Sequence, residues 1–178
     1  MRKEDAIKKY REFGKKHVLE ATAVHEAGHM MIAKALFPEQ EWNYGISKNG
    51  EPMVDGPGQL EYSTANEIVD IVRYCIAGVV NEANWLGLGD YVMDILKWTL
   101  EDEKQFAENN ECGAGDCTKV EELMAEYKEW FGRDFNLAVE ARSVLATLRH
   151  KANKQACMAE VHAAKRYFQD KNLEYVEH

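Results

Sequence analysis

Ala21-Thr-Ala-Val-His-Glu-Ala-Gly-His-Met-Met-Ile-Ala-Lys-Ala-Leu36 is the stretch around which the rest of the chain can be interpreted. Residues four apart on a helix lie on the same face, so His25 and His29 can direct two imidazoles at one metal ion while Glu26 flanks the same point. A catalytic zinc site has three protein ligands and a water, and a carboxylate beside the first histidine can accept the proton of that water. The stretch therefore predicts two zinc ligands and a general base, and the third ligand must come from elsewhere.

The residues around the motif predict how its helix is packed. Apolar side chains fall on more than one line of the helix, so we expect it to be buried on more than one side. Ala27 and Gly28 are small and would let another backbone approach closely. Pro38 follows Leu36 and is a typical stop signal. We expect the motif helix to begin between residues 20 and 22 and to end at Leu36.

The rest of the chain is dominated by helical spacing, which predicts a mainly α fold: a compact helical domain with a small β hairpin after the helix that carries the zinc-peptidase motif. Helical periods are expected over 3–17 with a break near Gly14, and over 64–87, 91–109, 116–130 and 136–170. Asp90 is the expected N-cap of the helix over 91–109, and the helix over 136–170 is expected to bend or break near Asn153. Glycine, proline and Asn49-Gly50 punctuate residues 41–62 and predict a hairpin with strands near 42–46 and 59–62.

Length and charge limit the classes of protein that fit. The chain has 178 residues, of which 46% are hydrophobic, and its net charge is -9. We predict a single domain over 1–178, with a leading basic helix at 1–19, a motif-bearing core at 20–130 and a C-terminal helical tract at 134–170. The acidic balance argues against nucleic acid as a partner. Without an apolar run of membrane-spanning length or a secretion signal, we expect no transmembrane segment and a cytoplasmic location.

One carboxylate interrupts an otherwise apolar helix face. Glu82 ends the stripe formed by Ile68, Ile71, Cys75 and Val79. Burying a carboxylate is costly unless it is paired or bound to a metal. Glu82 is therefore expected to contact the metal or to hold a ligand histidine through its second ring nitrogen, unless the helix end lets it reach water.

Three segments together resemble the FtsH-type peptidase domain, the zinc protease half of membrane-bound AAA proteases. Residues 22–29 are similar to that family's "ahHEAGHa" motif, which is the most specific of the three. Residues 76–83 resemble its "lAGraAEe" helix, with Asn81 where a small residue is usual. Cys112-Gly-Ala-Gly-Asp116 resembles the "tGAsnD" segment that supplies an aspartate ligand at a helix start. The resemblance covers about residues 20–130 and implies a helical fold with zinc held by two histidines and one aspartate.

Carried onto this chain, the resemblance makes His25, His29 and Asp116 the metal ligands, Zn²⁺ the cofactor and Glu26 the general base. A second alignment is open, because residues 93–99 also resemble the family's "nDlkkAT" and would make Asp94 the third ligand. Asp116 is preferred because the glycine-rich turn before it can swing its carboxylate inward and because a helical hairpin follows. Asp94 could equally be a first-turn acid that complements a helix dipole.

The resemblance also predicts what the protein acts on. It implies a zinc metalloendopeptidase that hydrolyses peptide bonds, here without the ATPase module that unfolds substrates for the family. We therefore expect flexible or unfolded polypeptide as the substrate. If the protein uses an unfolding partner, that partner would be a separate chain. Because the family often forms homo-oligomers, this chain could also form them. The alternative is a non-enzymatic helical interaction protein that retains a structural metal site.

Overall fold

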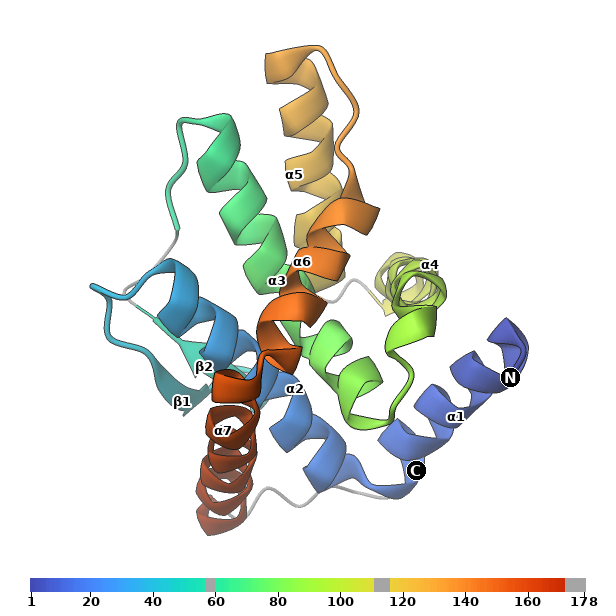
Figure 1. Ribbon diagram of the computed structural model, residues 1–178, viewed down its shortest axis with the longest axis vertical. Coiled ribbons are helices and arrows are strands. Elements are labelled where there is room, and N and C mark those ends of the chain that lie inside the picture. The colour runs from blue at the N-terminus through green and yellow to red at the C-terminus, as the bar shows by residue number, and fades with distance from the viewer. Residues whose placement is uncertain (57–59, 111–115, 172–178) are drawn as a thin grey trace.

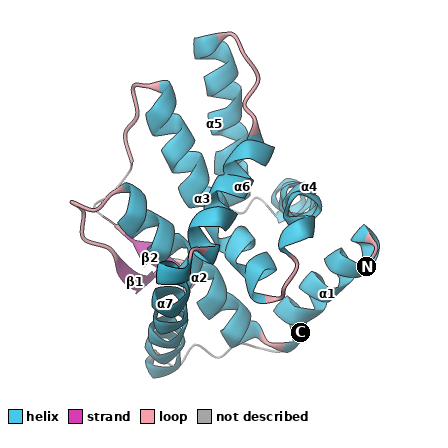
Figure 2. Cartoon of the chain, viewed as in Figure 1, coloured by secondary structure: helices cyan, strands magenta, loops and turns pink. Residues whose placement is uncertain are grey.

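The computed structural model describes residues 1–56, 60–110 and 116–171, and within these the side chains of 103–110, 116 and 117 are not described. The prediction of a mainly helical fold with one small hairpin is confirmed (Figures 1 and 2). Within the described part, none of the helices combines the length and apolar character needed to cross a bilayer. The elements are α1 (Lys3–Lys16), α2 (Val18–Leu36), β1 (Asn43–Ile46), β2 (Pro52–Asp55), α3 (Ala65–Trp85), the 3₁₀ turn η1 (Gly89–Tyr91), α4 (Val92–Asn110), α5 (Asp116–Phe131), α6 (Leu137–Arg149) and α7 (Lys151–Asp170).

The crossing of α2 and α3 is the centre of the molecule. A Cβ added to Gly28 of α2 would lie 2.5 Å from the backbone oxygen of Ala77 on α3, so the two helices approach more closely than any larger residue allows. On its other side α2 packs against α7, where Val24 and Ala27 are fully buried. The expectation that the motif helix is buried on more than one side is confirmed.

The C-terminal tract breaks at His150, three residues before the predicted position. The backbone of His150 turns out of the helix with ψ of 134°, and α6 and α7 meet there. Asn153 lies on the far side of the break and its side-chain amide donates to the backbone oxygen of Thr147 at 2.8 Å. Asn153 therefore stabilises the corner instead of forming it, and the break lets α6 pack on α3 while α7 packs on α2.

The hairpin has its second strand earlier than predicted. β1 and β2 pair antiparallel, with Ile46 opposite Pro52, and Gly50 takes a positive φ of 85° in the loop between them. Asn49-Gly50 thus closes the hairpin, because glycine adopts this conformation without steric cost. The strand expected over 59–62 is wrong for residues 60–62, which form no strand, and Gln59 lies outside the described residues.

Two predicted helix boundaries also need correction. Gly14 does not interrupt α1, which continues to Lys16. Asp90 lies inside η1 and is not the N-cap of α4, which begins at Val92. The turn that precedes α4 is closed by a bond from the Tyr91 amide to the backbone oxygen of Leu88, so Asp90 lies within this turn and not at the end of the helix.

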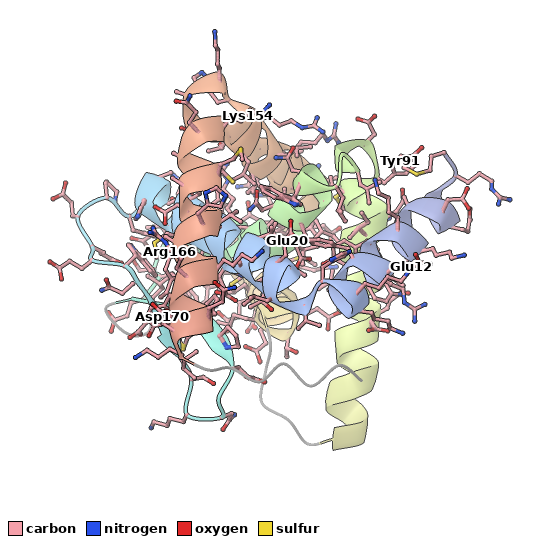
Figure 3. The ribbon with its side chains drawn as sticks, turned by 90° about the horizontal axis from the view of Figure 1, so that it is seen from below. Glu12, Glu20, Tyr91, Lys154, Arg166 and Asp170 are labelled. Carbon is pink, nitrogen blue, oxygen red and sulfur yellow. The ribbon has the colours of Figure 1, made fainter. Side chains whose placement is uncertain are left out.

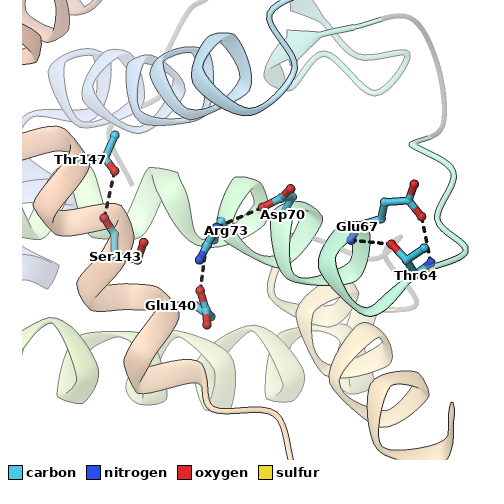
Figure 4. Close-up of polar contacts among 7 residues, drawn as sticks. All are labelled: Thr64, Glu67, Asp70, Arg73, Glu140, Ser143 and Thr147. Carbon is cyan, nitrogen blue, oxygen red and sulfur yellow. Dashed lines mark hydrogen bonds and ion pairs between the residues drawn. The ribbon is translucent and has the colours of Figure 1, made fainter. Parts of the chain in front are cut away.

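Polar contacts fasten α3 at its start and along its exposed side (Figure 4). Thr64 accepts from the Glu67 amide, and the Glu67 carboxylate accepts from the Thr64 amide in return, which forms a capping box. Arg73 donates to Glu140 of α6 at 2.7 Å and to Asp70 of its own helix at 3.1 Å. These contacts hold the helix that faces the motif in a defined register.

Candidate metal centre

The two motif histidines face each other across one turn of α2. The Nε2 atoms of His25 and His29 are 3.0 Å apart. His29 is only 3% exposed, whereas the side chain of His25 is 25% exposed. The structure thus brings the two predicted ligands together, with one ring enclosed by the core and the other reachable from outside.

The second nitrogen of each ring is held by an acceptor on α3. Nδ1 of His29 lies 2.8 Å from the backbone oxygen of Tyr74, and a carbonyl oxygen can only accept, so this nitrogen donates. Nδ1 of His25 lies 3.4 Å from Oε1 of Glu82. A neutral imidazole protonated at Nδ1 presents a lone pair at Nε2, so Nε2 of His29 is an acceptor. This atom lies 3.0 Å from Nε2 of His25.

This pattern fits a metal ion. The Nε2 atoms of His25 and His29 are 3.0 Å apart, and a zinc ion beside them could take both as ligands. Metal-binding histidines commonly donate their other N–H to a carboxylate or a backbone carbonyl, and here His29 donates to the Tyr74 oxygen while Nδ1 of His25 faces Glu82. The chemistry of the donor set is therefore the one that zinc uses.

Glu82 lies on the Nδ1 side of His25, away from the converging Nε2 atoms. The residue is 8% exposed, and Tyr10 of α1 donates its hydroxyl proton to Oε2. Of the roles expected for this buried carboxylate, the contact with a ligand histidine matches its position. The apolar stripe that Glu82 interrupts was the signal that pointed to it.

Gly78 makes room for the His25 ring. A Cβ at this position would lie 2.3 Å from Nε2 of His25 and 2.5 Å from its two neighbouring carbons. Sequence reasoning noted Gly78 only as part of a family-like motif and missed this role. The signal was available, because a glycine in the middle of a buried helix face usually marks a close approach.

Glu26 is buried at 7% exposure beside the first histidine. Burial, the charge of Glu160 and then that of Glu26 raise the pKa of Tyr44 above its ordinary value. The expected base is therefore a buried residue of α2 whose charge acts on Tyr44 of β1.

The predicted third ligand is not placed. Asp116 is the first residue of α5, as predicted for a helix start, but its side chain is outside the described residues, as are Cys112 and the side chain of Cys117. Asp94 lies in the first turn of α4. Where side chains are described, no three His, Cys, Asp or Glu form a group that could hold a metal. Neither Asp94 nor Glu82 therefore completes such a group with the histidines there.

Aromatic rings pack beside His29, and the sequence did not predict them. The ring of Tyr74 lies 5.1 Å from that of His29, and Trp42 lies 5.5 Å from Tyr74 and 5.9 Å from Phe37. The backbone oxygen of Tyr74 also accepts from His29. A backbone contact of this kind cannot be predicted from the identity of a side chain. Trp42 precedes β1, so the hairpin contributes to the surroundings of the site.

Comparison of the chain with protein-family models, with curated proteins and with solved structures finds no match in any of the three. The geometry of α2 and α3 is therefore the basis for assigning a role to the site. The resemblance to the FtsH-type peptidase domain stays a prediction.

Proposed function

We propose that the protein is a zinc-dependent metalloendopeptidase that cleaves flexible or unfolded polypeptide. The observation that carries the proposal is the convergence of the His25 and His29 Nε2 atoms at 3.0 Å while both Nδ1 atoms face acceptors on α3. Zinc would be held by these two histidines, with Asp116 as the proposed third ligand. Bound there, the ion would supply a Lewis acid that polarises a carbonyl and makes a water acidic near neutral pH.

The other residues of the site would transfer the proton and orient the two imidazoles. Glu26 follows the first histidine and is the proposed general base, accepting a proton from the attacking water and delivering it to the leaving nitrogen. Its burial at 7% exposure, directly after His25 in the sequence, supports this role, because it shields the carboxylate from bulk water. Glu82 and the Tyr74 carbonyl would hold the two imidazoles in the orientation that exposes Nε2.

Replacement of the proposed base tests the proposal. In Glu26→Gln, cleavage of casein or an unstructured peptide should fall by at least about 100-fold, because the amide cannot accept the proton. Zinc content and melting temperature should stay close to those of the parent protein. Glu20→Gln makes the same chemical change one and a half turns earlier on the same helix and should leave cleavage unchanged. Equal activity in Glu26→Gln and Glu20→Gln would refute the mechanism.

A structural metal in a non-enzymatic helical interaction protein is the second candidate. The burial of His29 at 3% exposure, at a crossing that joins the two hydrophobic clusters, favours it. Removal of the metal with a chelator distinguishes a catalytic metal from a structural one. A catalytic site should lose cleavage with little change in melting temperature, whereas a structural metal should lower the melting temperature steeply when removed.

A further inference from the structure

We infer that Tyr10 is a positioning residue of the metal site, acting on His25 through Glu82. The inference rests on the proposed function, because it concerns how the chain prepares a metal ligand. The Tyr10 hydroxyl donates to Oε2 of Glu82, and Oε1 of the same carboxylate lies 3.4 Å from Nδ1 of His25. The three side chains form a continuous line from α1 through α3 to α2.

The hydroxyl decides which way the Glu82 carboxylate points. A cavity of about 270 Å³ opens beside it, lined by Tyr10, Glu82 and Trp98, with Arg11, Lys15 and Asp102 among its walls. A carboxylate at such a boundary can turn toward water or toward Arg11 and Lys15. The bond from Tyr10 occupies Oε2 and leaves Oε1 directed at His25, so the orientation is fixed before any metal arrives.

Tyr10 is itself held in place by the packing of α1. The Lys9 ammonium donates to the backbone oxygen of Leu86 at the end of α3, at 2.8 Å. Phe13 is buried in the cluster that includes α2, and the Trp98 ring of α4 meets the Tyr10 ring edge-on with centroids 6.2 Å apart. Figure 3 shows α1 running past α4, with Glu12 on α1 and Tyr91 on the 3₁₀ turn η1 that precedes α4.

The leading helix therefore has a second role beside its basic surface. The sequence predicted only a leading basic helix over 1–19. The hydroxyl of Tyr10 reaches the carboxylate of Glu82, behind His25. Detachment of α1 would release Glu82 and, with it, the ring orientation of the ligand.

The test measures zinc affinity by competition with a chromogenic chelator in the full chain. Replacing a residue that supports a metal ligand typically weakens binding about 10- to 100-fold, and Tyr10 acts one bond further away. Tyr10→Phe should therefore weaken zinc binding by about 3- to 10-fold, with the fold preserved in circular dichroism. Lys9→Met removes one exposed polar contact of α1, while the packing of Phe13 and Trp98 still holds the helix, and should leave the affinity unchanged.

A double-mutant cycle with Glu82→Ala separates positioning from packing. If Tyr10 acts through Glu82, Tyr10→Phe should have almost no effect on zinc affinity once Glu82 is alanine. Equal losses in the two backgrounds, or a Lys9→Met loss as large as that of Tyr10→Phe, would overturn the inference.

Ring nitrogen NMR of the metal-free protein gives a readout that does not depend on metal binding. The parent protein should show the His25 proton on Nδ1, and Tyr10→Phe should mix in the other tautomer. A parent spectrum with the proton on Nε2 overturns the inference even if the variant does not fold. Absence of zinc binding by the parent would instead refute the proposed function, and the tautomer would still decide the role of Tyr10.

Discussion

The α2–α3 crossing has two polar sides that differ in how their groups are matched. On one side Asn81 donates to the backbone oxygen of Val24 at 2.7 Å and accepts from the thiol of Cys157 at 3.3 Å. On the other side His25 and His29 point their Nε2 atoms at each other. We refer to these as the asparagine side and the histidine side.

The comparison distinguishes the contacts that join α2 to α3 from the side chains that form the candidate metal site. On the asparagine side donors meet acceptors, so burial of these groups is compensated within the chain. On the histidine side Nδ1 of His29 donates to the Tyr74 oxygen, Nδ1 of His25 faces Glu82, and the two Nε2 atoms lie 3.0 Å apart. The asparagine side serves the packing of the two helices, whereas the histidine side carries the proposed metal site. Each side also has its own glycine at the contact, Gly28 or Gly78.

Gly28→Ala should give the largest loss of stability, because it forces the two backbones apart. The new Cβ would meet the Ala77 carbonyl at 2.5 Å and the Asn81 Cβ at 2.7 Å, and backbone cannot move aside cheaply. We expect the free energy of unfolding to fall by about 3 kcal/mol, at the upper end for overpacking. Urea denaturation measures this, and an unchanged midpoint would show that the crossing is looser than the contacts indicate.

Gly78→Ala is the matched change on the histidine side, and its main effect should be on metal binding. Here the Cβ meets the ring of His25, which can rotate away, and alanine also favours the helix by about 1 kcal/mol. The melting temperature should change little while zinc affinity falls by at least about tenfold. A variant that loses stability and keeps its zinc affinity would reverse the assignment of the two sides.

Asn81→Ala should lower stability without lowering zinc affinity. It removes the donor to Val24 and the acceptor for Cys157, at a cost of about 1–3 kcal/mol for a buried polar group. Thermal unfolding and a zinc titration on the same sample measure the two quantities. A parallel loss of zinc affinity would mean that the two sides are coupled through α3.

The smallest effect concerns the thiol of Cys157. Burial raises its pKa, against a smaller lowering by the bond to Asn81. The unfolded thiol ionises near its ordinary pKa of about 8.5, whereas the folded thiol ionises at a higher pH. The folded state is therefore favoured below about pH 8.5, and this contribution to stability is lost as the pH rises toward the folded value. At pH 9, alkylation of Cys157 followed by peptide mass mapping should therefore be slower in the folded protein than in urea. Equal rates would show that the asparagine side is open to solvent.

The sequence predicted the α2 site well because its information is local. Helical spacing places His25, Glu26 and His29 within two turns, and the interrupted apolar stripe identified Glu82. The structure confirms the helix and brings the histidines and Glu82 together. Their proposed chemistry is not tested by the fold.

What the sequence did not predict depends on contacts between distant segments. Tyr10 reaches Glu82 because α1 packs beside α3, and Tyr74 contacts His29 through its backbone oxygen. Neither contact produces a pattern of residues that could be recognised in the sequence. The second strand was misplaced because several turn signals compete between residues 41 and 62, and only pairing with β1 selects Asn49-Gly50 as the hairpin loop. The break at His150 was displaced for the same reason, since α6 and α7 pack on different partners.

The packing of α7 on α2 also has a consequence for folding during synthesis. Lys34 of α2 and Glu160 of α7 form an ion pair although 126 residues separate them. At a translation rate of about 5–20 residues per second, roughly ten seconds pass between the synthesis of these two partners. Until α7 emerges from the ribosome, the apolar face of α2 around Val24 and Ala27 lacks its cover. The nascent motif helix is therefore a natural target for chaperones that bind exposed apolar segments.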